Sequence, residues 1–170
     1  MRASRSALWL LAMVGLLMAL RPARAEVPAR LEELGRWGDR PAHCLRSWAG
    51  ERPGPCASVV LDQRTAGVMR VLLLAPAPPP LAYTQLSFVG QLQPGTEPMP
   101  CRQGACQLSR PMALTLSSVS QAEFDGRGLA RGLPSAWPVN GVCQLRPERI
   151  SCEARALSGE VWSAETREQR

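Results

Sequence analysis

Few side chains in this sequence have the types and spacing that catalysis requires. His43 is the sole histidine, and its neighbour Cys44 is one of six cysteines. Nucleophilic catalysis needs a serine, cysteine or threonine beside a general base, and the sequence has no lysine and no Gly-x-Ser-x-Gly motif. We expect His43 to be exposed or satisfied by its neighbours, and we expect no nucleophilic catalysis.

Glu123 and Asp125 are the best candidates for acid–base chemistry, because paired carboxylates hydrolyse glycosidic bonds. Gly126 and Gly128 follow them directly, so we interpret the stretch as a solvent-exposed turn. The glycines as far as Gly132 have neither the pattern nor the lysine of a phosphate-binding loop. Metal ligands are equally sparse. The sequence therefore predicts no enzyme, no cofactor and no metal site, and it favours binding as the activity.

An even number of cysteines in an exported chain is typical of a disulfide framework, and residues 1–25 have the pattern of an export signal. They are Cys44, Cys56, Cys101, Cys106, Cys143 and Cys152. Six cysteines allow fifteen pairings. Residues 101–106 (CRQGAC) can close a hairpin around the two-residue loop Gln103-Gly104. Its two cysteines would then be a non-hydrogen-bonded pair, about 4.5 Å apart at Cα, which a disulfide accepts.

The remaining pairs follow from a second turn. Cys143 and Cys152 are symmetric about Pro147-Glu148. Proline cannot adopt the positive φ of a type I′ turn and suits a type I turn in a longer loop, which leaves this register open. Cys44 and Cys56 are left to pair with each other. The alternative is a zinc site, although the CxxC spacing is absent.

The segment 100–111 (PCRQGACQLSRP) is the best candidate for a recognition loop. A disulfide would leave little loop entropy to lose on docking. The polar side chains that we expect to contact a partner are Arg102, Gln103, Gln107, Ser109 and Arg110. Ser109 is the most interesting, because its small hydroxyl both donates and accepts hydrogen bonds. The alternative is a hairpin with a structural role alone.

The rest of the chain, which must position this loop, consists mainly of segments with strand patterns. We expect strands over residues 56–61, 68–75, 82–93, 105–108, 112–120, 142–146, 149–157 and 160–164. One short helix is expected over residues 28–35, with Pro28 in its first turn and Gly35 at its end. Glycine and proline separate the strands. The pattern predicts a mainly β fold, a single antiparallel β-sandwich or open barrel with that N-terminal helix and three disulfides.

Residues 1–25 have the pattern of a secretory signal peptide. A basic start and an apolar run over residues 7–20 precede Ala-Arg-Ala at residues 23–25. The run is shorter than the roughly 20 residues of a membrane span, and a short anchor is the alternative. We expect cleavage before Glu26 and a single mature domain over residues 26–170. The arginine-rich, lysine-free composition favours the periplasm of a Gram-negative bacterium.

The charge of the chain argues against nucleic acid as a partner. Losing the four arginines of the signal lowers the formal net charge from +6 to +2. The remaining arginines are scattered among acidic residues, whereas nucleic-acid binding needs a concentrated basic face. We expect a protein partner and no membrane insertion of the mature chain.

The sequence resembles one family, the periplasmic immunity proteins that protect Gram-negative bacteria from type VI secreted peptidoglycan amidases. The resemblance is carried by the signal at residues 1–25, the size of the mature chain, the β-rich pattern and the polar loop over residues 106–110 (CQLSR). It implies that the chain plugs the active-site cleft of a Cys-His amidase. It further implies that Ser109 is the inserted residue and hydrogen-bonds the histidine of the toxin.

A second resemblance is to periplasmic lysozyme inhibitors, which are small β-barrels with a Ser-Gly-x-x-Tyr motif. Residues 158–162 (SGEVW) match that motif except that Trp162 replaces the tyrosine. Both resemblances imply an inhibitor of a cell-wall hydrolase. A non-enzymatic structural or assembly factor of the cell envelope is the further alternative.

Overall fold

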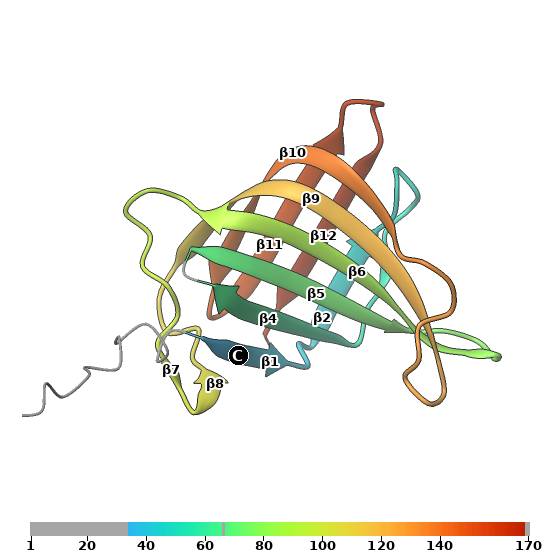
Figure 1. Cartoon of the computed structure of the whole chain (residues 1–170), viewed down its shortest axis with the longest axis horizontal. Coiled ribbons are helices and arrows are strands. Elements are labelled where there is room, and N and C mark those ends of the chain that lie inside the picture. The colour runs from blue at the N-terminus through green and yellow to red at the C-terminus, as the bar shows by residue number, and fades with distance from the viewer. Residues whose placement is uncertain (1–33, 66, 169–170) are drawn as a thin grey trace, which may run out of the picture.

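The computed structural model describes residues 34–65 and 67–168, which form β-strands joined by turns and loops (Figure 1). The strands are β1 (Gly35–Asp39), β2 (His43–Ser47), β3 (Gly54–Pro55), β4 (Ser58–Thr65), β5 (Val68–Pro76), β6 (Leu81–Leu92), β7 (Cys101–Arg102), β8 (Gly104–Cys106), β9 (Met112–Asp125), β10 (Ser135–Arg146), β11 (Arg149–Ala156) and β12 (Val161–Arg167). The predicted mainly β class is confirmed. No helix in this part of the chain is long and apolar enough to cross a membrane.

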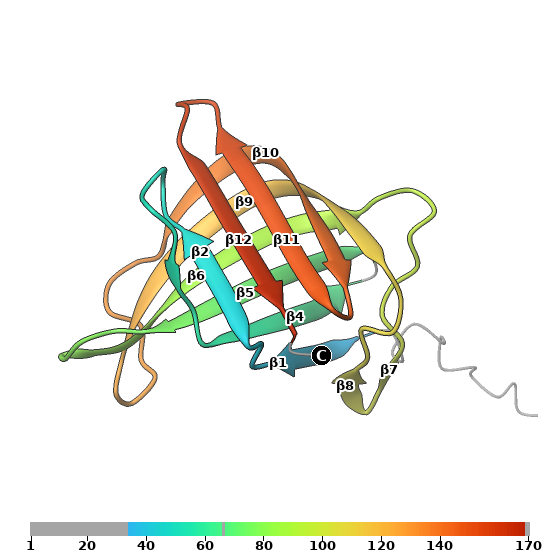
Figure 2. The same ribbon diagram turned by 180° about the vertical axis from the view of Figure 1, so that it is seen from behind.

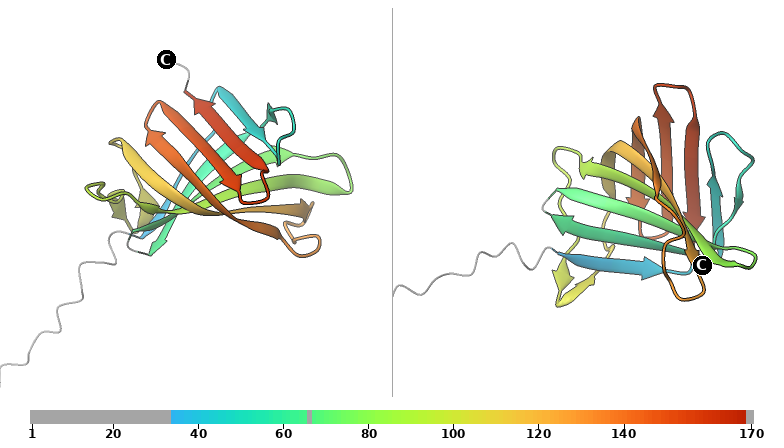
Figure 3. Two further views of the ribbon diagram at one scale, coloured as in Figure 1. Left: turned by 90° about the horizontal axis from the view of Figure 1, so that it is seen from above. Right: turned by 45° about the vertical axis from the view of Figure 1, so that its right-hand side comes forward.

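All twelve strands belong to one sheet in the order β3-β2-β12-β11-β10-β9-β6-β5-β4-β1-β8-β7. Neighbours are antiparallel except β1 and β8, which are parallel. Strands β1 and β2 lie far apart in this order, yet only residues 40–42 separate them in the chain. The sheet must therefore curl until the two strands meet, and it forms an open barrel (Figures 2 and 3).

The two ends of the barrel carry different segments. The hairpin end holds the β4–β5 and β10–β11 turns and the β7–β8 hairpin, because Gly35 pairs with Gln63 in β4 and with Gly104 in β8. The far end holds the β5–β6, β9–β10 and β11–β12 turns, which Figure 1 shows away from the hairpin. Any surface at one end is thus independent of a surface at the other.

The core fills the inside of the barrel. Alternate residues of each strand point inward, and Phe88, Leu114 and Trp162 are among the fully buried side chains. Each large apolar side chain contributes about 1.5–3 kcal/mol to folding by its burial. Between β6 and β9 the register shifts at Gly90, where an added Cβ would lie 2.5 Å from Thr115 O. A side chain at this position would therefore force the two long strands apart.

The three disulfides join the pairs that the sequence predicts. Cys44–Cys56, Cys101–Cys106 and Cys143–Cys152 have Cα–Cα distances of 5.0, 3.9 and 4.1 Å. Cys143 pairs directly with Cys152 across β10 and β11, and Arg146 pairs with Arg149 around a two-residue loop. The turn at Pro147-Glu148 is therefore a two-residue loop rather than a longer one, and this fixes the register that the sequence left open. No cysteine among the described residues is free, which indicates an oxidising compartment.

Several strand boundaries differ from those predicted. Strand β10 begins at Ser135 rather than at residue 142. Pro138 is tolerated in this strand because it pairs only with β9, and the pairing with β11 begins one residue later, at Val139. Strands β1 and β2 are absent from the prediction, since they are short and polar. Residues 28–33 of the expected helix, like the signal peptide, lie outside the described residues. Gly35, its expected last residue, instead begins β1.

Candidate functional site

The β7–β8 hairpin has the two-residue loop that its sequence predicts. Gln103 and Gly104 have φ angles of 51° and 82°, which is the positive pair that a type I′ turn requires. Arg102 pairs with Ala105, and Cys101 with Cys106. The cysteines are buried, whereas the residues between them are exposed. The hairpin therefore presents an exposed tip on a covalently closed base.

The base of the hairpin is held by the core as well as by its disulfide. Met99 is fully buried, and its backbone exchanges two hydrogen bonds with the Gln63 side chain, at 3.2 Å from Nε2 and 3.0 Å to Oε1. Leu108 is buried on the other side. Gly35 lets β1 approach, because an added Cβ would lie 2.4 Å from Gly104 O. Little of this segment can move without breaking a buried contact.

The five residues predicted to contact a partner fall into two groups. Arg102 and Gln103 are exposed at the tip. Gln107, Ser109 and Arg110 are exposed on the segment that returns from the hairpin to β9, and the buried Leu108 lies between them. Arg110 forms an ion pair with Glu97 on the outgoing segment. The structure thus brings all five to one end of the barrel but not into one tip.

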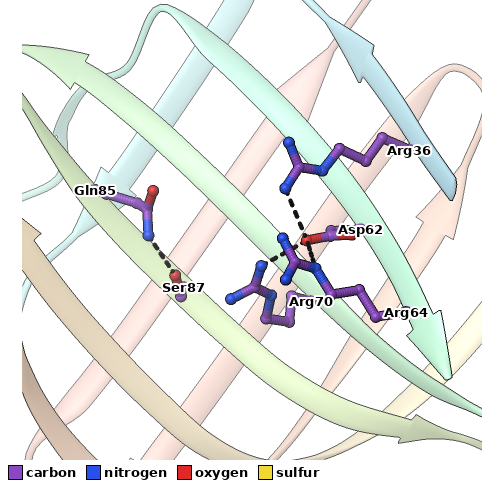
Figure 4. A network of polar contacts seen from close by, with 6 residues as sticks. All are labelled: Arg36, Asp62, Arg64, Arg70, Gln85 and Ser87. Carbon is purple, nitrogen blue, oxygen red and sulfur yellow. Dashed lines mark hydrogen bonds and ion pairs between the residues drawn. The ribbon is translucent and has the colours of Figure 1, made fainter. Parts of the chain in front are cut away.

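Beside the hairpin, three arginines surround one buried carboxylate on the outside of the barrel (Figure 4). Asp62 in β4 is 2% exposed. Its Oδ2 accepts from Arg70 Nη2 at 2.5 Å and from Arg64 Nε at 2.9 Å, and it lies 3.5 Å from Arg36 Nη2. One acid among three arginines leaves a net charge of +2 on this cluster.

Burial alone would raise the pKa of the Asp62 carboxyl. The hydrogen bonds from Arg70 and Arg64, together with the charge of Arg36, outweigh that effect and lower the pKa from its ordinary value. Asp62 is therefore ionised at neutral pH. The arginine side chains are 37–62% exposed, so each is partly open to solvent, although Arg70 Nε is buried without an acceptor.

The arginine cluster continues the surface of the hairpin. Arg102 pairs with Ala105, Ala105 with Arg36, Arg36 with Asp62, and Asp62 with Arg70. Directly paired residues point to the same face of a sheet. We call this set, together with Arg64, the arginine row. The arginine row could not be predicted from the sequence, because its arginines are far apart in the chain and only the strand register aligns them.

The candidates for catalysis are not assembled into a site. His43 is exposed, and Cys44 is held in its disulfide. Asp125 ends β9 and accepts hydrogen bonds from the backbone N–H groups of Leu129, at 3.0 Å, and Arg127, at 2.9 Å. The bond from Leu129, then that from Arg127, lowers the pKa of Asp125. The turn begins at the exposed Gly126, whereas Glu123 and Asp125 themselves lie within β9, so the interpretation of the two carboxylates as turn residues is wrong.

Among the described residues, no group of three or more His, Cys, Asp and Glu side chains is placed to hold a metal ion. No family model matches the chain, and no match is found among curated proteins or solved structures.

Proposed function

We propose that this protein is a periplasmic inhibitor that binds a secreted cell-wall-degrading enzyme and blocks its active cleft with the segment 101–110. The favoured partner is a type VI secreted amidase with a Cys-His active site, to which the protein confers immunity. The observation that carries the proposal is the hairpin itself, an exposed polar tip on a base fixed by a disulfide and by buried contacts.

Rigidity of this kind favours binding for a physical reason. Docking a flexible loop costs conformational entropy, whereas a loop already closed in its bound form loses little. Inhibition needs only that the cleft be occupied, so a few satisfied hydrogen bonds and a fitting shape suffice. Arg102 and Gln103 at the tip, and Ser109 on the return segment, supply such donors and acceptors.

The arginine row adds an electrostatic requirement on the partner. Its net positive charge lies beside the hairpin on the same face of the sheet. A positive surface next to a docking element speeds encounter with a negative surface and suppresses encounters with positive ones. We therefore expect the rim of the blocked cleft to be acidic.

The three disulfides agree with an oxidising compartment, and the pattern of residues 1–25 narrows the proposed location to the periplasm. An inhibitor at this place would meet cell-wall hydrolases that enter from outside.

The test is inhibition of peptidoglycan hydrolysis by Cys-His amidases, beginning with any that is encoded next to this protein. The mature chain should inhibit one of them at a one-to-one ratio. Arg102→Glu should weaken inhibition at least tenfold, whereas Arg155→Glu, the same charge change on exposed β11, should leave it unchanged. Equal inhibition by both variants would place the contact elsewhere, and no inhibition of any amidase would remove the proposal.

A lysozyme inhibitor is the second candidate, supported by the place of residues 158–162. Ser158, Gly159 and Glu160 lie in the β11–β12 turn at the far end, and the buried Trp162 lies in β12. Gly159 has a φ of 103°, and Leu157, which begins the turn, is 91% exposed. An exposed apolar side chain beside a polar turn suits a contact surface. Inhibition of lysozyme that is lost in Ser158→Ala and kept in Ser109→Ala would favour this candidate over the first.

A further inference from the structure

Arg46 reaches across the inside of the barrel at its far end. It lies in β2, and its Nη2 donates a hydrogen bond to Thr84 Oγ1 in β6. Four strands separate β2 from β6 in the sheet, so this bond crosses the lumen. The guanidinium also lies 5.2 Å from the ring centre of Trp48, as a cation–π contact.

The charge of Arg46 has no counter-ion in the part of the chain that is described. None of the ion pairs among these residues includes it. Its Nη1 is buried and has no protein acceptor. Burial lowers the pKa of the guanidinium, as expected where no carboxylate offsets the loss of water. A buried charge is costly unless it is paired.

Two further buried donors at this end have no acceptor among the described residues, Gln121 Nε2 and Trp162 Nε1. Gln121 pairs with Leu86, two residues from Thr84 on the same inward face of β6. Trp162 is two residues from Ala164, which pairs with Arg46. Most buried donors in proteins have a partner, so three without one at one end of a lumen are unusual.

A pocket of about 190 Å³ opens at this end of the barrel, and Gln121 is the one of these donors that lines it. Trp48 and Gln121 line it from opposite sides of the barrel mouth, and Leu133, which is 96% exposed, stands at its rim. Glu123 is the one carboxylate among its lining residues, and Arg131 lines it as well. The lining thus holds one acid and one base, and Arg46, bonded to Thr84 across the lumen, adds an unpaired positive charge to this end of the barrel.

We propose that the far end of the barrel binds a carboxylate that carries an apolar body. The carboxylate accepts from Arg46 Nη1 and Gln121 Nε2, and the apolar body packs against the half-buried Trp48 and against Leu133. Three donors without acceptors fit an anion, and the aromatic wall fits an apolar group better than a bare inorganic ion. This site does not depend on the proposed inhibitor function, because it lies at the opposite end from the hairpin.

The test is a titration of the ¹⁵N-labelled mature protein, followed by the indole N–H signals in NMR spectra. Hexanoate represents a free acid, and N-acetyl-leucine represents the C-terminus of a chain; each is matched by its neutral amide. We expect a saturable shift of the Trp162 and Trp48 signals with at least one acid and with neither amide. Trp37, on β1, serves as the internal control.

Arg46→Gln should weaken the binding about tenfold or more, whereas Arg64→Gln, an equal loss of charge on the outer face, should leave it unchanged. If Arg46→Gln does not fold, Gln121→Leu should weaken binding severalfold. Shifts that are equal for acid and amide, that do not saturate, or that persist in both variants would overturn the proposal. So would tighter binding of inorganic phosphate than of either acid.

Discussion

The two ends of the barrel differ in how far their buried polar side chains are paired. At the hairpin end, the buried side chains of Gln63 and Asp62 are paired, the first with the backbone of Met99 and the second with its arginines. One buried donor there, Arg70 Nε, has no acceptor among the described residues. At the far end, three buried donors have no acceptor among the described residues: Arg46 Nη1, Gln121 Nε2 and Trp162 Nε1. The first arrangement is stable by itself and can serve as a rigid surface. The second gains stability from an added partner, which is what a ligand site requires.

Asp62→Ala should lower the free energy of unfolding most, because it removes the only acid among the described residues that pairs with the arginines of the arginine row. Breaking a buried ion pair costs about 3–5 kcal/mol, and the exposure of the arginines reduces this to about 2–3 kcal/mol here. Denaturant unfolding measures the change. Asp125→Ala, which removes an exposed carboxylate at the far end, should cost clearly less; an equal loss would show that the two ends do not differ.

The same carboxylate sets a dependence on pH. Because the folded pKa of Asp62 is lowered, its contribution is complete above the unfolded pKa of about 3.9 and is lost as the pH falls through the folded value. Unfolding free energies from pH 6 down to pH 2 should fall less steeply for Asp62→Asn than for the parent. Parallel curves would contradict the assignment.

Removing the Cys101–Cys106 disulfide should cost about 2 kcal/mol, the value expected for a short closed loop. We expect the Cys101→Ser/Cys106→Ser variant to keep the barrel fold, because Met99 and Leu108 still anchor the segment. Hydrogen exchange should speed up at residues 101–106 and stay slow in β9. Faster exchange throughout the sheet would show that the hairpin is part of the folding core rather than a separate element.

Arg46→Met should change stability in the opposite direction. Replacing an unpaired buried charge by an apolar side chain of similar length is neutral or stabilising, here by about 1 kcal/mol. Thermal unfolding at neutral pH measures it, with Arg155→Met as the exposed control. A loss of more than about 1 kcal/mol would mean that Arg46 is satisfied in the folded protein and would weaken the contrast between the ends.

Ser109→Ala should have the smallest effect, confined to binding. Loss of one hydroxyl hydrogen bond costs about 0.5–1.5 kcal/mol of affinity, or up to about 3 kcal/mol if it pairs with a charged imidazolium. Ser109→Trp should cost more in a narrow cleft. Calorimetry against the proposed hydrolase partner measures both losses of affinity, and unchanged stability of the free protein would show that each loss belongs to the interface.

The features that the sequence predicted are local. The hairpin with its Gln103-Gly104 loop, the disulfide pairs and most strands follow from short-range spacing. The unpredicted features depend on long-range register. Asp62 meets Arg70 only when the β4–β5 register is known, and Arg46 meets Thr84 only once the sheet has curled into a barrel. The start of β10 was not predicted, because a proline usually argues against a strand and the sequence does not show that Pro138 pairs with β9 alone.

The most direct test of the central claim is calorimetry of the mature protein and its Arg102→Glu/Ser109→Trp variant against the cell-wall hydrolase proposed as its partner, with Arg155→Glu as the control. The account predicts one-to-one binding by the parent and the control, and an affinity at least tenfold weaker for the hairpin variant. Raising the salt concentration should also weaken binding by the parent if, as proposed, the arginine row meets an acidic rim. Binding of the hairpin variant at the parent's affinity would contradict the account.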